Sequence, residues 1–298
     1  MWKPYWICRR QRRSATCIVC LAIVYIVFFN TFAFIFLSRS NNSTTSLVSK
    51  HGSRYIGIVD IRSLCKTPTL SKIPLPRTAL VSFPGSGNTW IRHIVQQATG
   101  ILTGSVYNDK SLLQNGFPGE GISNGSVILI KTHKWGEMER SRYRRAVLIL
   151  RNPYDALLAE FNRRHGGHMG YASEMHFRSE WSKYVTIMSD EWVKMNYDWL
   201  QFSSSLHVTH YENFRKNPKA EIKSLLKFLN VTIPFKDMLC VMKNVNGYHK
   251  RIQTKTTRYE PFPSHIRTKI DADIAFIESE LLIANNGRTL THSLRSQD

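Results

Sequence analysis

A turn of small residues separates a short apolar run from a helical pattern in the first third of the chain. The run 79–81 leads into the turn 84–87, and apolar residues recur at helical spacing from 90 onward. A strand, a glycine turn and a helix N-terminus together bind phosphate-like anions, because unpaired backbone N–H groups and the helix dipole face the turn. We therefore predict an anion site formed by Gly85, Ser86, Gly87, Asn88, Thr89 and Trp90.

This turn differs from the phosphate loop of nucleoside triphosphatases. That loop reads G-x-x-x-x-G-K-[ST], and its lysine reaches the terminal phosphates of the nucleotide. The turn 84–87 has no lysine at the corresponding place, so a Walker-type nucleoside triphosphatase is not expected. A tight strand-to-helix connection without a ligand is the alternative, and the other motifs of the chain favour the anion site.

Two further strand-like runs end in residues that could bind or react with an anion. The run 126–130 is followed by Lys131 and His133, and the run 146–150 is followed by Arg151. Ligands of open α/β sheets bind at the carboxyl ends of the strands. We predict that Lys131 supplies a cation, that His133 is a base titrating near neutrality, and that Arg151 grips a second phosphate bidentately.

The elements that must position these residues alternate along the chain. Short apolar runs and helical patterns follow one another from 77 to 290, which predicts an α/β domain with a central parallel sheet flanked by helices. A domain of this length can bury a substantial core. Aromatic residues and methionines between Trp181 and Trp199 fall at helical spacings, and we interpret them as core packing.

The N-terminal segment has the pattern of a membrane anchor. Residues 15–37 are uncharged and mostly apolar, which is long enough to cross a bilayer, whereas a cleaved signal peptide has a shorter apolar core. Basic residues precede this run, so the positive-inside rule places residues 1–14 in the cytosol. We expect a type II signal anchor at 15–37, a stem at 38–76, a lumenal catalytic domain at 77–290 and a flexible tail at 291–298.

The charge of the chain restricts its partners. There are 41 Lys and Arg residues against 21 Asp and Glu, a formal net charge of +20. In a lumenal compartment nucleic acid is not an expected partner, and an anionic cofactor, an anionic glycan or a membrane surface fits better.

The lumenal part contains two cysteines, Cys65 and Cys240, and an oxidising compartment favours a disulfide between them. Their spacing and that of the other cysteines suggest no metal site. The Asn-x-Ser/Thr pattern of N-glycosylation occurs at Asn41, Asn42, Asn124 and Asn230.

Four motifs in order resemble the sulfotransferases that use 3′-phosphoadenosine 5′-phosphosulfate (PAPS). SFPGSGNTW resembles their 5′-phosphosulfate loop, IKTH the strand end with their catalytic histidine, and RNPYDALLAEFNR their 3′-phosphate segment. HYENFRKNPKAEIKSLLKFLN is similar to their Tyr-Glu strand and the Asn-Pro-capped helix that follows it. AEFNRRHGGHMGYAS and YNDKSLLQNGFPGEG are similar in particular to the WSC-domain-containing (WSCD) family, although the sequence contains no cysteine-rich WSC module.

This resemblance covers nearly all of 77–290 and implies a P-loop-like sulfotransferase domain with PAPS as co-substrate and no metal. It implies that His133 takes the proton of an acceptor hydroxyl and that Lys131 neutralises charge on the bridging oxygen. Trp90 would then border the adenine. Lys250 and Arg251 stand in the place of the family's late phosphate-binding loop.

The sequence departs from the family pattern at two positions of the expected cofactor site. Gly85 stands where many sulfotransferases have Lys or Arg, and Ala159 stands where the family often has a phosphate-binding Ser. The missing cation must then come from elsewhere in the chain. Lys131 is the first candidate, and Lys134 and Arg92 are the next candidates.

The expected protein is a Golgi-type membrane sulfotransferase that acts on a glycan hydroxyl. The basic charge favours sialylated glycans, and the plasma membrane is the alternative location.

A sulfotransferase fold that has lost turnover is an alternative interpretation, supported by Gly85 and Ala159. A type II glycosyltransferase is another, because 271–273 reads Asp-Ala-Asp, although this triplet lies in a helical pattern. The weaker base candidates are His165, His168 and Glu160.

Overall fold

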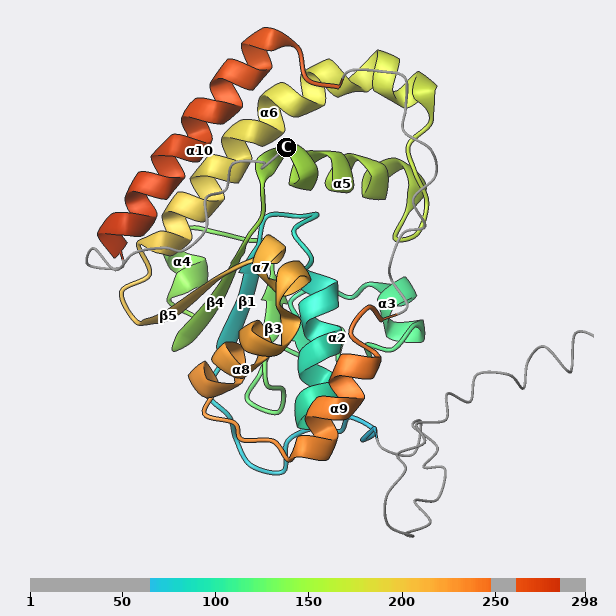
Figure 1. The fold of residues 1–298 in the computed structure, drawn as a ribbon, viewed down its shortest axis with the longest axis vertical. Coiled ribbons are helices and arrows are strands. Elements are labelled where there is room, and N and C mark those ends of the chain that lie inside the picture. The colour runs from blue at the N-terminus through green and yellow to red at the C-terminus, as the bar shows by residue number, and fades with distance from the viewer. Residues whose placement is uncertain (1–64, 248–260, 285–298) are drawn as a thin grey trace, which may run out of the picture. The chain divides into compact units, whose positions relative to one another are not determined.

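The computed structural model describes residues 65–247 and 261–284 of the 298-residue chain. All of them belong to the second of the chain's two compact units, Ile58–Asp298. They form an α/β fold around a five-stranded parallel sheet, so the predicted α/β class with a central parallel sheet is confirmed (Figure 1). The strands are β1 (Thr78–Ser82), β2 (Gly104–Ser105), β3 (Ile130–Thr132), β4 (Arg145–Leu150) and β5 (Ser205–His210).

Helices cover both faces of the sheet. Alternate residues of β1 enter two different cores, because successive side chains of a strand point to opposite faces. Val81 packs with α5, α6 and α10, whereas Leu80 packs with α2, α8 and α9. The described helices are α2 (Asn88–Thr99), α3 (Lys110–Gln114), α4 (Glu137–Arg140), α5 (Pro153–Gly166), α6 (Glu174–Leu200), α7 (Tyr211–Lys216), α8 (Pro218–Phe228), α9 (Phe235–Lys243) and α10 (Ser264–Ala284).

The strand order places three strand ends side by side. The order is β2-β3-β1-β4-β5, so β1 lies between β3 and β4. Strands β2 and β3 lie on one side of β1, and strands β4 and β5 lie on the other. In the ladder Leu80 is opposite Lys131, and Ser82 is opposite Ile149. The residues that follow β3, β1 and β4 therefore meet at one edge of the sheet, where α/β folds bind their ligands.

Two Asn-Pro pairs start the helices that follow β4 and β5. The Asn152 side chain accepts a hydrogen bond from the Tyr154 backbone N–H, and Pro153 occupies the first turn of α5. Asn217 and Pro218 repeat this arrangement at the start of α8. Asparagine is a favoured N-cap, and the fixed backbone angle of proline suits the first helical position.

The aromatic stripe of α6 packs in the core, as predicted from its spacing. The side chains of Trp181, Trp192 and Trp199 are buried. Each indole N–H finds a backbone carbonyl, and two of these carbonyls lie just after the strands that end at the expected site: Trp192 donates to Arg151 at 3.3 Å and Trp199 to Lys134 at 3.0 Å. The core aromatics thus hold the backbone that follows β4 and β3.

Residues 65–76, assigned from composition to the stem, are attached to the folded unit. Thr69 pairs with Ile101 as an isolated bridge, and the Leu75 N–H donates to the Gly125 carbonyl at 2.8 Å. A disulfide joins Cys65 to Cys240, the two cysteines expected to pair. Backbone hydrogen bonds and a covalent bond hold this segment, which explains why it shows no apolar periodicity.

Two strands are shorter than their apolar runs suggested. Tyr211 and Glu212, expected to lie in a strand, begin helix α7. The Glu212 carboxylate accepts the Asn152 backbone N–H at 3.1 Å and also stands in the first turn of α7, where the helix dipole favours an acid. The run 126–130 likewise contributes only its last residue to β3.

The predicted cytosolic tail (1–14), signal anchor (15–37) and C-terminal tail (291–298) lie outside the described residues. Within the described ranges, no helix combines the length and the apolar character needed to cross a bilayer.

Candidate anion-binding and active site

The glycine turn between β1 and α2 has the backbone geometry of an anion-binding loop. Gly85 and Gly87 both have positive φ, 83° and 89°. Gly87 is the N-cap of α2, and no described side chain caps this helix. The N–H groups of its first turn, at 88–90, cannot bond within the helix, so they are available to a ligand.

The loop packs so tightly against α5 that its first glycine cannot be replaced without strain. A Cβ on Gly85 would lie 2.5 Å from the Ala156 carbonyl oxygen and 2.9 Å from the Glu160 nitrogen. It would also lie 3.3 Å from the Cβ of Ala159. The two departures from the sulfotransferase pattern, Gly85 and Ala159, therefore meet in one contact, and this contact excludes a lysine or arginine at 85.

Two buried side chains of the loop have different roles. Ser86 is 1% exposed, and its hydroxyl has no hydrogen-bond partner among the described residues. Asn88 points back to the sheet, where its Nδ2 donates to the Leu80 carbonyl at 2.9 Å. The Asn88 side chain therefore fixes the loop to β1 and leaves no Nδ2 donor for a phosphate. Asn88 and Thr89 can still offer their backbone N–H groups to an anion, and Ser86 can offer its hydroxyl.

Arg151 approaches the loop from the end of β4. Its Nη1 donates to the Gly85 carbonyl at 2.6 Å, and its guanidinium carbon lies 4.2 Å from the centre of the Tyr211 ring. Its Nη2 is 3.6 Å from Asp155, and its buried Nε has no hydrogen-bond partner among the described residues. Arg151 thus brings positive charge to the turn and keeps one donor unused.

Trp90 also contacts Tyr211. The ring centres of Trp90 and Tyr211 are 5.4 Å apart in an edge-on arrangement, and Trp90 also contacts Phe214. Its indole N–H donates to the Val245 carbonyl. The predicted contact between Trp90 and an adenine stays a prediction, but the indole is held in a fixed position beside the loop.

His133 is held as a neutral base. Its Nδ1 lies 2.7 Å from the Ser82 carbonyl oxygen. A carbonyl only accepts hydrogen bonds, so we assign the proton to Nδ1 and the lone pair to Nε2. Burial, followed by the positive charge of Lys131, lowers the pKa of His133 to about 4. The prediction that His133 titrates near neutrality is therefore wrong: the imidazole is uncharged at neutral pH, and its Nε2 can accept a proton.

Lys131, the residue of β3 that lies two positions before this base, is 8% exposed. Burial, followed by the charge of Arg92, lowers the pKa of Lys131 to about 8. It forms no ion pair within residues 65–247 and 261–284. Its ammonium group therefore remains available to an anionic ligand.

The other candidate cations are less suitable. Arg92 is buried and forms an ion pair with Glu120, so its charge is already compensated. Lys134 is exposed.

The weaker base candidates are all engaged. Burial raises the pKa of Glu160, but hydrogen bonds from Arg163 and Arg164 outweigh this effect and lower it. His168 pairs with Asp109 at 2.9 Å, and His165 lies 3.7 Å from Glu180. Of the predicted bases, His133 alone has both a fixed tautomer and a place at the end of β3.

Tyr107 belongs to this site and was missed by the sequence analysis. Its Oη accepts the His133 backbone N–H at 2.9 Å, and its ring stacks on the imidazole. The signal was the run YNDKSLLQNGFPGEG, which supported the family resemblance but assigned no role to its tyrosine. Strand β2 has two residues, so no apolar pattern revealed that 107 lies beside 133.

The remaining predicted residues lie apart from the loop. Asn124 and Asn230 are exposed, as glycosylation would require, and glycosylation of both stays a prediction. Four further predicted residues lie outside the described residues: Asn41, Asn42, Lys250 and Arg251.

The Asp-Ala-Asp triplet is not arranged as a metal site. It lies on helix α10, where Asp271 accepts the Tyr154 hydroxyl at 2.8 Å and Asp273 pairs with Lys269 at 2.7 Å. Among the described residues, the one group with metal-type ligands in proximity is His165, His176 and Glu180, at the junction of α5 and α6. The absence of a catalytic metal stays a prediction.

Comparison with known proteins gave related sequences, but no protein-family model matches the chain. WSCD family member AAEL009094 of Aedes aegypti is 40% identical over 199 residues, which cover 65% of this chain and 62% of that protein. WSCD family member CG9164 of Drosophila melanogaster is 39% identical over 198 residues, with the same coverage. The predicted resemblance to the WSCD family is confirmed. The chain spans about three fifths of the length of these relatives.

Two sulfotransferases are among the solved structures that resemble the chain. Mouse sulfotransferase SULT7A1, complexed with PAP, has a TM-score of 0.46 and 14% identity, covering 71% of this chain and 86% of that one. A sulfotransferase from Alicyclobacillus acidocaldarius has a TM-score of 0.41 and 14% identity, covering 74% and 98%.

The contact between Gly85 and α5 can be tested with a matched glycine. Gly116 also has positive φ, 98°, but a Cβ there would meet nothing within 4 Å. Alanine at either position incurs backbone strain of about 1–2 kcal/mol, but only alanine at 85 also clashes with α5. We expect Gly85→Ala to lower the free energy of unfolding in urea by about 2 kcal/mol more than Gly116→Ala. Equal losses would contradict the packing described.

Proposed function

We propose that the chain is a PAPS-dependent sulfotransferase of the WSCD family, which transfers a sulfuryl group to a hydroxyl group of a glycan. The observation that carries this proposal is the meeting of an uncapped helix N-terminus, the unpartnered Ser86 hydroxyl and the His133 imidazole at adjacent strand ends. The resemblance to the WSCD family supports it from the sequence side.

The residues of the loop fit the anionic end of PAPS. Buried polar groups normally have hydrogen-bond partners, and Ser86 Oγ and Arg151 Nε lack them among the described residues. Both atoms can donate to phosphate oxygens. Together with the first-turn N–H groups of α2, they would hold the 5′-phosphosulfate, and Arg151 would contribute to binding the 3′-phosphate.

Bound PAPS would supply an activated sulfuryl group. In the proposed reaction, the acceptor oxygen forms the new S–O bond while the bond between sulfur and the bridging oxygen breaks. His133 Nε2 takes the proton of the acceptor hydroxyl. Lys131 stabilises the negative charge that grows on the bridging oxygen, which replaces the cation that Gly85 cannot provide. As in phosphoryl transfer, in-line positioning and charge stabilisation would supply the catalysis.

The proposed acceptor and location rest on the sequence. The predicted signal anchor at 15–37, the four glycosylation patterns and a net charge of +15 after the predicted cytosolic tail (20 minus the five Lys and Arg of that tail) support a lumenal enzyme of the Golgi membrane that acts on acidic glycans. The disulfide between Cys65 and Cys240 also favours an oxidising compartment. Sialylated glycans are the acceptors to test first, and the plasma membrane is the alternative location.

One observation favours a second candidate, a sulfotransferase fold without turnover. The loop has no cationic side chain, and Arg151 uses one donor to hold the Gly85 carbonyl. In such a protein the nucleotide would bind without transfer, or would not bind at all.

Binding of PAP, the desulfated product of PAPS, tests the proposed cofactor site. By calorimetry on the purified chain we expect a micromolar Kd. Because each removes a donor at the anion site, Ser86→Ala and Arg151→Ala are expected to weaken binding by about tenfold or more, roughly 1.4 kcal/mol each. Ser179→Ala, an exposed serine on α6, serves as the control and should bind like the wild type. A folded sample that binds no PAP at millimolar concentration would overturn the proposal.

The pH dependence of transfer tests the two catalytic roles. His133 stays neutral above pH 4, so kcat/KM should show no fall between pH 7 and 5, where a histidine of ordinary pKa would become charged. Lys131 loses its proton above about pH 8, so kcat/KM should fall there. In Lys131→Arg the guanidinium stays charged, and the alkaline fall should move to higher pH. An acid fall near pH 6.5, or an unchanged alkaline fall in Lys131→Arg, would contradict these roles.

A further inference from the structure

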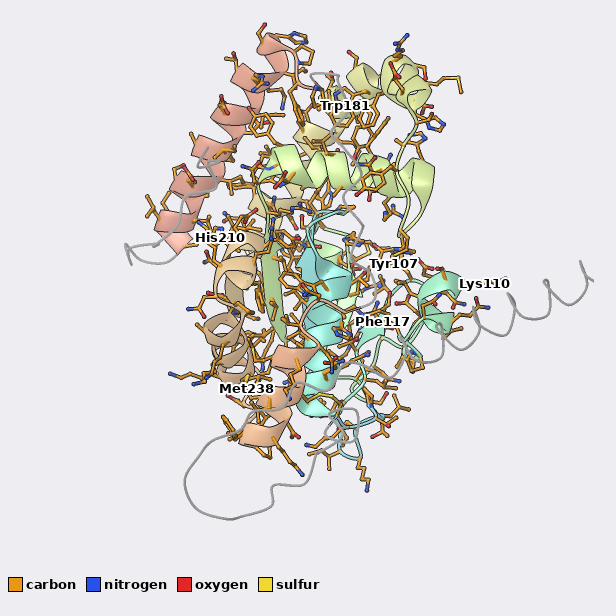
Figure 2. All side chains as sticks on the ribbon, turned by 45° about the vertical axis from the view of Figure 1, so that its right-hand side comes forward. Tyr107, Lys110, Phe117, Trp181, His210 and Met238 are labelled. Atoms are coloured by element: carbon orange, nitrogen blue, oxygen red, sulfur yellow. A yellow bond between two sulfur atoms is a disulfide. The ribbon has the colours of Figure 1, made fainter. Side chains whose placement is uncertain are left out.

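We propose that Tyr107 is a positioning residue that fixes His133 and Lys131 at the end of β3. This inference rests on the proposed function, because that function gives His133 and Lys131 their catalytic roles. Tyr107 follows β2 and lies on the same side of the fold as Lys110, the first residue of α3 (Figure 2).

The phenol contacts the catalytic histidine in two ways. Tyr107 Oη accepts the His133 backbone N–H at 2.9 Å. The two rings also stack, with centres 5.7 Å apart and an angle of 29° between their planes. Strand β3 ends at Thr132, so the His133 N–H lies just beyond the strand and has no partner in the sheet ladder. The hydroxyl of Tyr107 therefore supplies an acceptor to a donor that the sheet does not satisfy.

The same ring also faces the catalytic lysine. Lys131 Nζ lies 5.7 Å from the centre of the Tyr107 ring, within the range of a cation–π interaction. Lys131 lies in β3 and His133 follows the strand two residues later, and one aromatic side chain contacts both of them. A change at Tyr107 should thus act on both groups without touching the substrate.

The edge of the sheet holds Tyr107 rigidly. The Val106 N–H donates to the Lys131 carbonyl at 3.0 Å, and the Gly121 N–H donates to the Tyr107 carbonyl at 2.7 Å. The Tyr107 N–H itself donates to Ser105 Oγ at 3.0 Å. Burial raises the pKa of Tyr107, opposed by hydrogen bonds with the His133 backbone and the Thr132 side chain, so the hydroxyl stays protonated at neutral pH.

The imidazole needs this support because its other anchor is a single hydrogen bond. Nδ1 is fixed to the Ser82 carbonyl, which sets the tautomer. Rotation about this bond would still move Nε2 away from an acceptor hydroxyl. The stacked phenol blocks that rotation, and the bond to Oη fixes the backbone from which the imidazole projects.

The test uses Tyr107→Phe, which keeps the ring and removes only the hydroxyl. We expect kcat for sulfuryl transfer to fall by about tenfold, a loss of one buried hydrogen bond. The Kd for PAP should stay within twofold, because the anion loop is untouched. The control is Tyr184→Phe, which removes a buried hydroxyl that donates to the Leu157 carbonyl on α5 and should leave kcat unchanged.

A double-mutant cycle separates positioning from a general effect on the fold. If Tyr107 acts through His133, Tyr107→Phe should cause no further loss in a His133→Ala background. A merely structural role would lower the rate by the same factor in both backgrounds. Equal losses, or an unchanged kcat in the single variant, would overturn the proposal.

Nitrogen-15 NMR of the His133 side chain tests the contact without any turnover. The wild-type chain should show the Nδ1–H tautomer and slow amide exchange at His133, and Tyr107→Phe should keep this tautomer, which the Ser82 carbonyl sets, but show faster amide exchange. If the wild-type chain transfers no sulfate but gives these spectra, the proposed function fails and the positioning contact stands. Fast amide exchange at His133 in the wild type would contradict the contact, even if the variant does not fold.

Discussion

The hydrogen bond from His133 to the carbonyl of Ser82 joins the two strand ends on which the site depends. It is possible because β3 and β1 are parallel neighbours, with Lys131 in register with Leu80. The carbonyl belongs to the residue that leads into the glycine turn, so the position of the base is coupled to the position of the anion loop. β4, on the other side of β1, brings Arg151 to the same turn. The strand order therefore determines which charges meet.

Close packing explains how the site differs from the sulfotransferase pattern. The turn lies against α5 with no room for a Cβ at 85, and Ala159 lines the same contact. A long cation in the loop is thus sterically excluded, and in the proposed site Lys131 on β3 supplies the positive charge instead. The pKa of Lys131 is lowered by burial, which makes its charge sensitive to a bound anion. In the proposed site, a lysine on β3 thus takes the place of a lysine or arginine in the loop, and positive charge stays next to the bound phosphosulfate.

The sequence predicted those parts of the site that lie on continuous patterns. The anion loop follows an apolar run and precedes a helical one, and Lys131, His133 and Arg151 directly follow strands, so linear spacing identified them. Other features depend on contacts between distant segments. The Asn88 amide turns to Leu80, Arg92 is compensated by Glu120, and Tyr107 reaches His133 from the segment that follows β2, a strand of two residues. No local pattern marks such contacts. Residues 65–76 were assigned to the stem for the same reason. A disulfide and backbone hydrogen bonds attach them to the fold, and neither kind of contact leaves an apolar pattern in the sequence.

The central claim is that the turn after β1 binds the phosphate end of a nucleotide, and a crystal structure of the chain with PAP tests it most directly. The account predicts that phosphate oxygens lie within hydrogen-bond distance of the backbone N–H groups of 88–90 and of Ser86 Oγ. It also predicts that His133 Nε2 faces the side of the 5′-phosphate from which an acceptor would approach. A structure in which PAP lies away from this turn, or in which the Ser86 hydroxyl bonds to protein and not to the nucleotide, would contradict it.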